Sequence, residues 1–421
     1  MGAFLDSMLA GRDGLGGVRA EAAAALLRDG LPGPREEAWK YTSLRALEQR
    51  RYAPAPGEAT DVPALAAFAL PGVDGARLVF VNGVFQPALS DLQAAPGVEI
   101  LPYREHPGQL DKDLEGHHGT GSADAFLRLN TALVEDGASI RVVAGADAGA
   151  PIHLVILGAP AAADLAWQLR LQVELGAGAR LSLVEHHLGN DEHAHLGNLV
   201  ANYVLGAGAR LELLQVQDAG ERATLIRRGS FHVGEDAQLA ATTLEAGAQM
   251  TRHDFRVHLA GRGARLESRG VFVLHGRQHA DTHMDVRHEA RDTSSDVLWR
   301  GVADQRSRGV FHGAITIAEG ADGADAALSN KNLLLSPQAE IDTQPALEIY
   351  ADEVKAAHGA TVGQLDEQAL FYLRTRGIPL DAARRILVSA FCSAVFADLQ
   401  PAVLRERLDE LLATRLPQAG E

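Results

Sequence analysis

The sequence predicts a mostly β protein, with a β-solenoid core between an N-terminal, mostly helical region and a C-terminal helical region. Two observations predict this class: a glycine-led repeat runs through the middle of the 421-residue chain, and helix-forming segments lie on both sides of it. We expect residues 1–135 to form the N-terminal cap region, residues 136–348 the β-helix, and residues 349–421 the C-terminal helical domain.

The N-terminal region combines helical segments with one predicted hairpin. Val18–Arg28 is rich in strong helix formers, and Ser122–Val134 carries apolar residues on one helical stripe. The hairpin is expected near residues 78–85, because Asn82 followed by Gly83 suits the positive φ angles of a tight turn. This region can therefore cover one end of the solenoid, where terminal strands would otherwise expose unpaired edges.

The middle region repeats a turn followed by a strand. Its turns read GAGARL twice, then GEDAQL and GRGARL, and the closing residues are Leu181, Leu211, Leu239 and Leu266. The repeat is therefore 30, 28 and then 27 residues long. A period near 28 with two short strands and two turns predicts a stacked β-solenoid, in which glycine permits each sharp corner. An ordinary β-sandwich does not predict a fixed period.

The C-terminal region predicts three helices. They cover Asp366–Arg376, Asp381–Phe396 and Pro401–Leu416, and we expect Asp381 to cap the second. Their apolar residues recur at helical spacing, so the helices can pack as a small bundle that leaves one face for a partner protein. The last coil of the solenoid should leave an open strand edge beside them.

Composition and missing motifs argue for a protein that acts by binding partners. The formal net charge of −16 disfavours nucleic acid or an anionic membrane as the main partner. The start of the sequence lacks a secretory signal, so we expect a cytoplasmic protein. Cys392 is the single cysteine, which excludes an internal disulfide or a site built from several of the chain's own thiolates. Because no P-loop, nucleophile elbow or zincin motif occurs, we expect no catalytic residues.

Histidines offer three candidate metal-binding places. The first is a strand and loop that also carries acidic residues, and the second is a run in which three of four members share one strand face. For the first group a solvated solenoid loop is the favoured interpretation, and for the second a functional metal role is disfavoured. The third is His358, which stands alone beside Gly359. The first group comprises His186, His187, His193 and His195, and the second comprises His275, His279, His283 and His288.

Several long segments resemble the SufB/SufD superfamily of iron–sulfur cluster assembly. EEAWKYTSL (residues 36–44) resembles its SufD branch, whereas residues 292–315, NKNLLL (330–335) and residues 344–377 resemble the C-terminal half of the superfamily. The single cysteine and the His-Gly-Ala at 358–360 favour the SufD branch over the SufB-type scaffold paralogue, which is the alternative. A carbohydrate-active β-helix enzyme is a further alternative, disfavoured by the low aromatic content of 5%.

This resemblance implies a right-handed parallel β-helix that pairs with SufB through its strands and docks the ATPase SufC through its C-terminal helices. It implies that His358 is a candidate ligand for iron or a nascent cluster shared with SufB, and that this chain alone holds no stable cofactor. It also allows a homodimer when the chain is isolated. The candidate SufC dock comprises Asp366, Phe371, Tyr372, Arg374, Arg376, Arg384 and Arg385.

Overall fold

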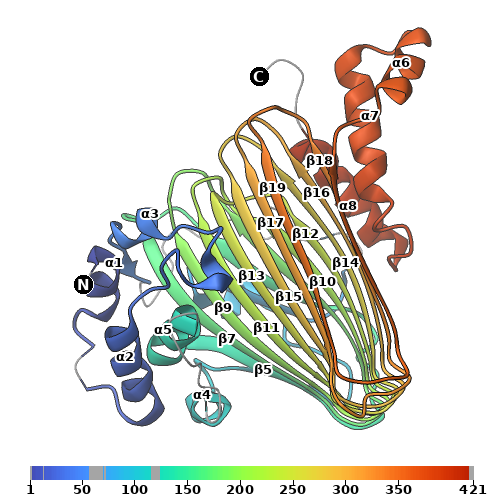
Figure 1. Cartoon of the computed structure of the whole chain (residues 1–421). Coiled ribbons are helices and arrows are strands. Elements are labelled where there is room, and N and C mark those ends of the chain that lie inside the picture. Colours follow the sequence, from blue (N-terminus) through green and yellow to red (C-terminus); the bar gives the residue numbers. More distant parts are fainter. Residues whose placement is uncertain (1, 13, 56–69, 71–72, 115–123, 417–421) are drawn as a thin grey trace.

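The protein is built around a parallel β-solenoid, which confirms the predicted fold class. The computed structural model describes residues 2–12, 14–55, 70, 73–114 and 124–416. Two ten-stranded sheets form the solenoid, and the chain alternates between them (Figure 1). The N-terminal helices lie beside the early coils, and the C-terminal helices stand at the other side (Figure 1).

The first sheet consists mainly of β5 and the later odd-numbered strands, which are all parallel to one another. β4 pairs antiparallel with β5 at its first edge, and β19 is its last edge. Its strands are β1 (Ala53–Pro54, paired with β7), β4 (Val98–Pro102), β5 (Asp136–Val142), β7 (Leu165–Leu175), β9 (Leu196–Leu205), β11 (Thr224–Val233), β13 (Met250–Leu259), β15 (His279–His288), β17 (Arg308–Ile317) and β19 (Glu340–Ile349).

The second sheet contains the even-numbered strands from β6 onward, together with an N-terminal hairpin. The hairpin strands β2 and β3 are antiparallel, and its turn residues Asn82 and Gly83 both have positive φ. The strands are β2 (Arg77–Val81), β3 (Val84–Phe85), β6 (Ile152–Gly158), β8 (Arg180–Gly189), β10 (Arg210–Asp218), β12 (Gln238–Glu245), β14 (Arg265–Leu274), β16 (Ser294–Ala303), β18 (Asp325–Leu334) and β20 (Lys355–Gly363).

Helices cover the outer faces of the two sheets. α5 packs on β7 and β9 of the first sheet, and α7 and α8 pack on apolar residues of the second. The α-helices are α1 (Ala3–Leu9), α2 (Gly17–Asp29), α3 (Arg45–Glu48), α4 (Pro107–Leu114), α5 (Ala125–Leu133), α6 (Glu367–Thr375), α7 (Leu380–Ser393) and α8 (Ala402–Arg415); the 3₁₀ helices are η1 (Glu37–Trp39) and η3 (Pro87–Leu89).

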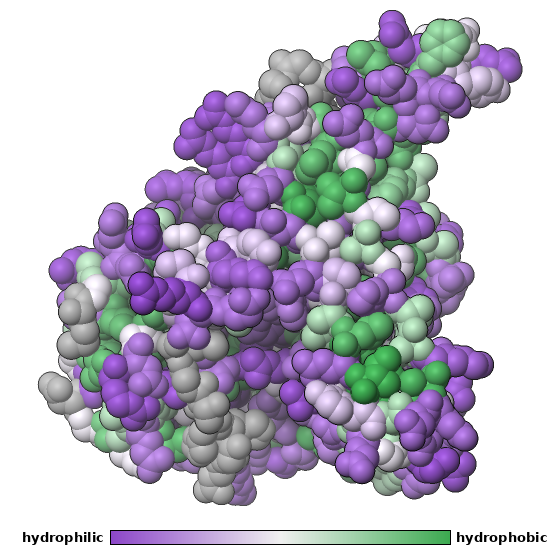
Figure 2. All heavy atoms as spheres, viewed as in Figure 1, coloured by the Kyte–Doolittle hydropathy of each residue, from purple (hydrophilic) through white to green (hydrophobic). Residues whose placement is uncertain are grey.

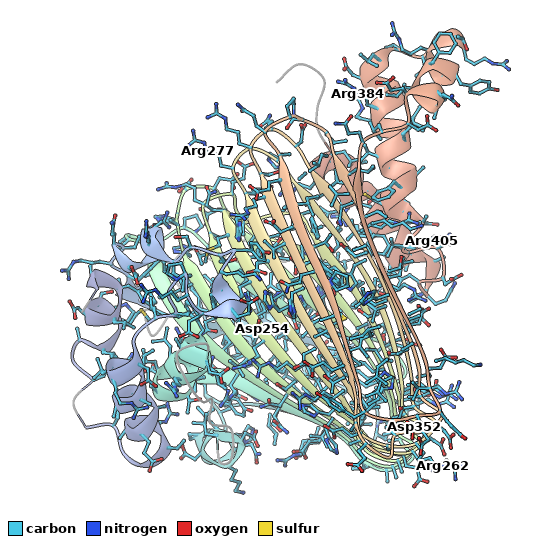
Figure 3. The ribbon with its side chains drawn as sticks, in the orientation of Figure 1. Asp254, Arg262, Arg277, Asp352, Arg384 and Arg405 are labelled. Atoms are coloured by element: carbon cyan, nitrogen blue, oxygen red, sulfur yellow. The ribbon has the colours of Figure 1, made fainter. Side chains whose placement is uncertain are left out.

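The repeated leucines stack directly on one another. Leu181 pairs with Leu211, which pairs with Leu239, which pairs with Leu266, and all four are buried. The register stays constant although the repeat shortens, because the length changes fall beyond the stacked leucines. The strands that carry them, β8, β10 and β12, become shorter in turn, and the loops that follow shorten from residues 190–195 to 219–223 and then 246–249. In Figure 3, Arg262 and Asp352 mark the glycine-rich corner, and Arg277 marks the opposite one.

The glycine-rich corner is held by a ladder of backbone hydrogen bonds. Gly178 and Gly208 have φ angles of 67° and 66°, which an L-residue rarely adopts. Each donates its N–H to the next coil, Gly178 to Ala207 and Gly208 to Glu235, at 2.7 Å in both cases. Asp236 takes the same place in the following coil at φ 51°. The corner therefore explains why glycine recurs in the sequence.

Two features of the C-terminal region differ from the sequence-based expectation. We expected the β-helix to end at residue 348, but β20 continues it to Gly363, since Ala356 remains in register with Ala326 of β18. Asp381 lies in the first turn of α7 and does not cap it; Pro379 takes the N-cap position, and its missing N–H costs nothing there. Asp366 does cap α6, through the backbone N–H groups of Gln368 and Ala369.

The surface is largely hydrophilic. On the face seen in Figure 2, hydrophobic residues gather at the foot of the C-terminal helices and toward the lower corner of the strands. Within the described residues, none of the helices has the length and apolar character needed to cross a membrane.

Candidate functional site

The solenoid ends in an open rung formed by β19 and β20. Each of these strands pairs on one side only, β19 with β17 and β20 with β18. Ile349, Tyr350 and Val362 on or beside them are 45%, 63% and 42% exposed. An edge with free backbone groups and exposed apolar side chains is the kind of surface that pairs with another strand.

His358 lies on β20, in a row of residues that face the solenoid interior. Its partner in β18 is Leu328, which pairs with Val297 of β16, and both are buried. Ala356, two residues before His358, packs against the same core. In the part of the chain that the structure describes, no further coil covers this row at β20, and the His358 side chain is exposed. The interior row of the solenoid thus ends in an imidazole at the open rung.

A buried polar brace ties the two edge strands together behind the open rung. Asn330 Oδ1 accepts hydrogen bonds from Asn332 Nδ2 at 2.6 Å and from Thr343 Oγ1 of β19 at 2.8 Å. Asn332 Nδ2 also donates to the Thr361 carbonyl of β20 at 3.2 Å. Sequence reasoning missed this brace, although the alternation of Asn330 and Asn332 in NKNLLL places both on one strand face.

The second candidate surface is the arm formed by α6 and the start of α7, which extends away from the strands (Figure 1). None of the residues of α6 is buried. Phe371 is 71% exposed, Tyr372 58% and Ile386 46%. Exposed aromatic side chains with arginine nearby are typical of protein interfaces.

The predicted dock residues fall on this arm with different roles. Asp366 is engaged in capping α6, and Arg376 lies over the Tyr372 ring with its guanidinium 5.3 Å from the ring centre. Arg374 and Arg384 are exposed and Arg385 is half-buried. Figure 3 shows Arg384 on the arm, away from the solenoid. The arm and the open rung are separate surfaces joined by residues 364–366.

Cys392 is poorly suited to be a metal ligand. It is fully buried in α7 against the second sheet. Burial raises the pKa of its thiol to about 12, and the nearby Arg300 lowers it only in part. The thiolate is the form that binds metal, so Cys392 is a structural residue here.

The first histidine group is not a solvated loop, because His186, His187 and His195 are buried, and members of both groups bond neighbouring residues. His187 bonds Glu185, and the stacked pair His193 and His195 receives hydrogen bonds from the backbone N–H groups of Ala161 and Leu165. In the second group, His279 contacts Thr42, His283 contacts Asp281, His275 contacts Glu221, and His288 contacts Thr293 and Ser295. Among the described residues, no three His, Cys, Asp or Glu side chains are arranged to hold a metal ion.

The EEAWKYTSL segment is a strap on the outer face of the first sheet. The Thr42 hydroxyl lies 2.8 Å from His279 Nε2 and donates to the buried Asp281 carboxylate. Arg252 and Arg308 cover the rings of Trp39 and Tyr41, at 4.5 and 5.7 Å from the ring centres. The strap therefore joins the N-terminal region to the later coils.

Comparison with known proteins supports the family suggested by these features. Residues 159–391 match the family model described as SUF system FeS cluster assembly, SufBD core domain, and residues 10–154 match the SufBD protein N-terminal region. The chain belongs to the SufBD family. As a SufBD protein it is a member of an iron–sulfur cluster assembly family, as its sequence motifs indicated.

Individual relatives cover nearly the whole chain. The iron–sulfur cluster assembly protein SufD of Escherichia coli (strain K12) is 29% identical over 398 residues, which are 93% of this chain and 91% of the relative. A SufBD family protein of Synechocystis, slr0076, is 29% identical over 91% of this chain and 87% of its own length. The chloroplast protein ABCI7 of Arabidopsis thaliana is 25% identical over 93% and 84%. The chain is thus a homologue of SufD.

Proposed function

We propose that this SufBD protein is the SufD-type subunit of a cytoplasmic SufBCD complex, with no enzymatic activity of its own. In this proposal the open rung pairs with a SufB-type scaffold, and the α6–α7 arm docks a SufC-type ATPase. His358 contributes one ligand for iron or a nascent cluster at the junction with the scaffold. The observation that carries the proposal is the open rung itself, where an exposed histidine ends an otherwise buried row.

The chemistry of His358 suits a shared site. A neutral imidazole binds iron, whereas the single cysteine of this chain is buried. The remaining thiolate or carboxylate ligands would therefore come from the partner. Such a shared site would form only when the two proteins meet, so assembly of the complex and assembly of the cluster would be coupled.

The arm supports the proposed ATPase dock. Its exposed Phe371, Tyr372 and Ile386 offer apolar anchors, and its arginines offer a polar rim. The arm shares no residue with the open rung, so one chain could hold both partners simultaneously. The chemical work of ATP hydrolysis would then reside in the partner.

Co-expression of the chain with SufB-type and SufC-type partners tests these roles. We expect His358→Ala to leave the complex stoichiometry unchanged and to lower iron–sulfur cluster yield about tenfold, the scale of losses around metal sites. Subunit ratios would be measured by native mass spectrometry, and the cluster by its visible absorbance.

Two matched variants separate the surfaces. His232→Ala removes an exposed histidine from the outer face of the first sheet and should preserve both partners and the cluster yield. Phe371→Asp should release the ATPase and keep the scaffold. Normal cluster yield in the His358→Ala complex would exclude the ligand role.

A further inference from the structure

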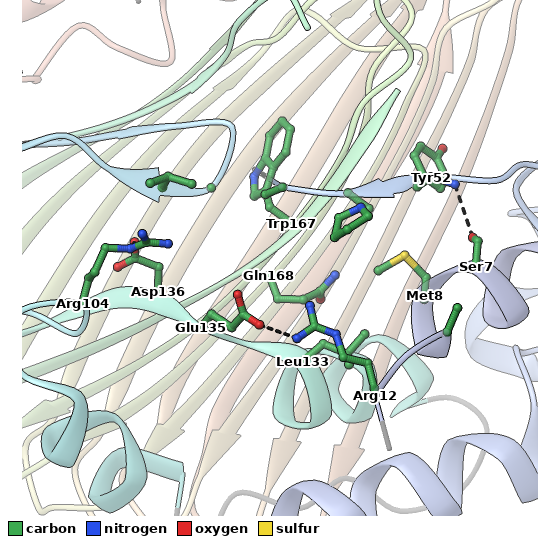
Figure 4. Close-up of a pocket in the computed structure, with 16 residues that line it drawn as sticks. Ser7, Met8, Arg12, Tyr52, Arg104, Leu133, Glu135, Asp136, Trp167 and Gln168 are labelled. Atoms are coloured by element: carbon green, nitrogen blue, oxygen red, sulfur yellow. Dashed lines mark hydrogen bonds and ion pairs between the residues drawn. The ribbon is translucent and has the colours of Figure 1, made fainter. Parts of the chain in front are cut away.

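A pocket of about 290 Å³ lies at the capped end of the solenoid, away from the open rung (Figure 4). α1, β1, the hairpin turn and the start of β7 form its walls. Trp167 forms an apolar wall, and the hairpin turn fits closely on it: a Cβ on Gly83 would lie 2.2 Å from Trp167 Cβ. Small-molecule sites are typically pockets of this kind, with apolar walls and a few polar groups.

Gln168 gives the pocket an unused hydrogen-bond donor. Its side chain lines the pocket and is 6% exposed. Gln168 Oε1 accepts from Asn198 Nδ2 at 2.6 Å, which fixes the amide orientation, because the flipped amide would set two donors against each other. Among the described residues, Nε2 has no hydrogen-bond partner. A buried donor without a partner is unfavourable, so the site favours a ligand that brings an acceptor.

Two arginines add positive charge to the same pocket. Arg12 pairs with Glu135, and the two side chains are 33% and 58% exposed. Exposed ion pairs of this kind are weak, so Arg12 can exchange Glu135 for a ligand oxyanion. Arg104 pairs with Asp136 at 3.2 Å, but Asp136 also accepts 2.8 Å hydrogen bonds from the backbone N–H groups of Phe85 and Gly137. If Arg104 turned toward a ligand, the Asp136 carboxylate would therefore still accept these two backbone hydrogen bonds.

We propose that this pocket binds a small organic oxyanion with a flat apolar body. The apolar body would pack against Trp167 and Tyr52, and its carboxylate or phosphate would accept hydrogen bonds from Gln168 Nε2 and Arg12. Glu135 and Asp136 already pair with the two arginines, whereas the Gln168 donor has no partner among the described residues and favours an acceptor-bearing anion over a neutral ligand. This site is independent of the open rung and of the arm.

Ligand-observed NMR titration of the full chain tests the proposal, with benzoate and phenyl phosphate as the two oxyanion probes and benzyl alcohol as the neutral one. We expect saturable binding of at least one oxyanion probe and weaker binding of benzyl alcohol. Gln168→Leu should weaken the binding about fivefold, the effect of one lost hydrogen bond, and Arg12→Gln should weaken it by at least as much. The better oxyanion probe distinguishes a carboxylate from a phosphate ligand.

Gln172→Leu is the matched control. Gln172 lies on the same strand and is equally buried at 6%, but it does not line the pocket. Gln172→Leu should leave probe affinity unchanged. If Gln168→Leu unfolds the protein, Arg12→Gln tests the same site. The proposal is overturned if neither oxyanion binds saturably, if benzyl alcohol binds equally well, or if Gln172→Leu weakens binding as much as Gln168→Leu.

Discussion

Arg227 of β11 lies at the centre of a charge cluster buried inside the solenoid. Its guanidinium is 2.7 Å from Glu245 and 3.4 Å from Glu185, while His187 and His253 bond the same carboxylates. Burial alone would raise the pKa of Glu185, but the hydrogen bond from His187 and the charge of Arg227 outweigh it and hold this pKa at about 2. Arg227 therefore balances one of the two carboxylate charges, and the hydrogen bonds of His187 and His253 support both carboxylates.

Arg227→Met should lower the free energy of unfolding by about 3–5 kcal/mol at pH 7.5, since it leaves two buried carboxylates without their cation. In wild type, the stabilisation from Glu185 is present above its ordinary pKa of 4.5 and is lost as the pH falls toward 2. In the variant the folded-state pKa of the carboxylates rises, so the deficit should narrow at pH 5. Urea unfolding at both pH values measures this difference in unfolding free energy between variant and wild type. An equal difference at pH 7.5 and pH 5 would contradict the prediction. Arg287→Met, at an exposed pair, should change stability by less than about 1 kcal/mol.

The contacts that a side chain makes were harder to predict from the sequence than the helix or strand in which it lies. His187 and His195 were expected in a solvated strand and loop, but both are buried, His187 within β8 and His195 against Trp167 of the preceding coil. Asp381 looked like a cap from its position, yet Pro379 begins α7 two residues earlier. Such roles depend on which side chains lie across neighbouring coils, and a single coil's sequence does not contain that information.

At the scale of the elements, the brace of Asn330 and Asn332 should hold the last strand in place. Asn332→Leu removes the hydrogen bonds to Thr361 and Asn330 while keeping a similar volume. We expect amide exchange in β20 to become about fivefold faster, the effect of losing roughly one hydrogen bond. Hydrogen-exchange mass spectrometry on the isolated chain measures this without any partner.

Lys331→Met is the control for this brace, because Lys331 is exposed on the opposite face of the same strand. It should leave exchange in β20 unchanged. Unchanged exchange in Asn332→Leu would show that the brace does not hold the strand. If exchange in β20 becomes faster while partner binding is unaltered, the brace holds the strand but is not needed for the proposed pairing with the scaffold.

The elements themselves were largely predictable. The leucine repeat predicted the stacked register, and the predicted helices Asp366–Arg376 and Pro401–Leu416 match α6 and α8 within one residue at each end. The placement of α7 and α8 on the outer face of the second sheet was not predictable, because apolar rows such as Val216 and Leu244 look like ordinary strand residues until the partner helix is known.

At the scale of the whole molecule, packed elements connect the arm to the solenoid. α7 and α8 share a buried apolar cluster with the second sheet, and only residues 364–366 separate β20 from α6. Force applied to the arm by a docked ATPase would therefore reach the rung and any strand paired with it. We expect cluster assembly to require movement at that pairing.

A reversible disulfide between Thr361→Cys and a cysteine in the facing strand of the scaffold tests this movement. It should block cluster assembly and leave ATP binding intact, and a reductant should restore assembly. The buried Cys392, with its high thiol pKa, should not compete for the bond. Full assembly with the disulfide closed would contradict the coupling.

The constant leucine register has a consequence for how such a protein can change over time. Because four successive coils meet through the same leucine stack while the loops and strand ends take up differences in length, a coil could be gained or lost without disturbing either terminus. The number of coils then determines the distance from the capped end to the open rung. Lineages could adjust that span while keeping the capped end and the open rung intact.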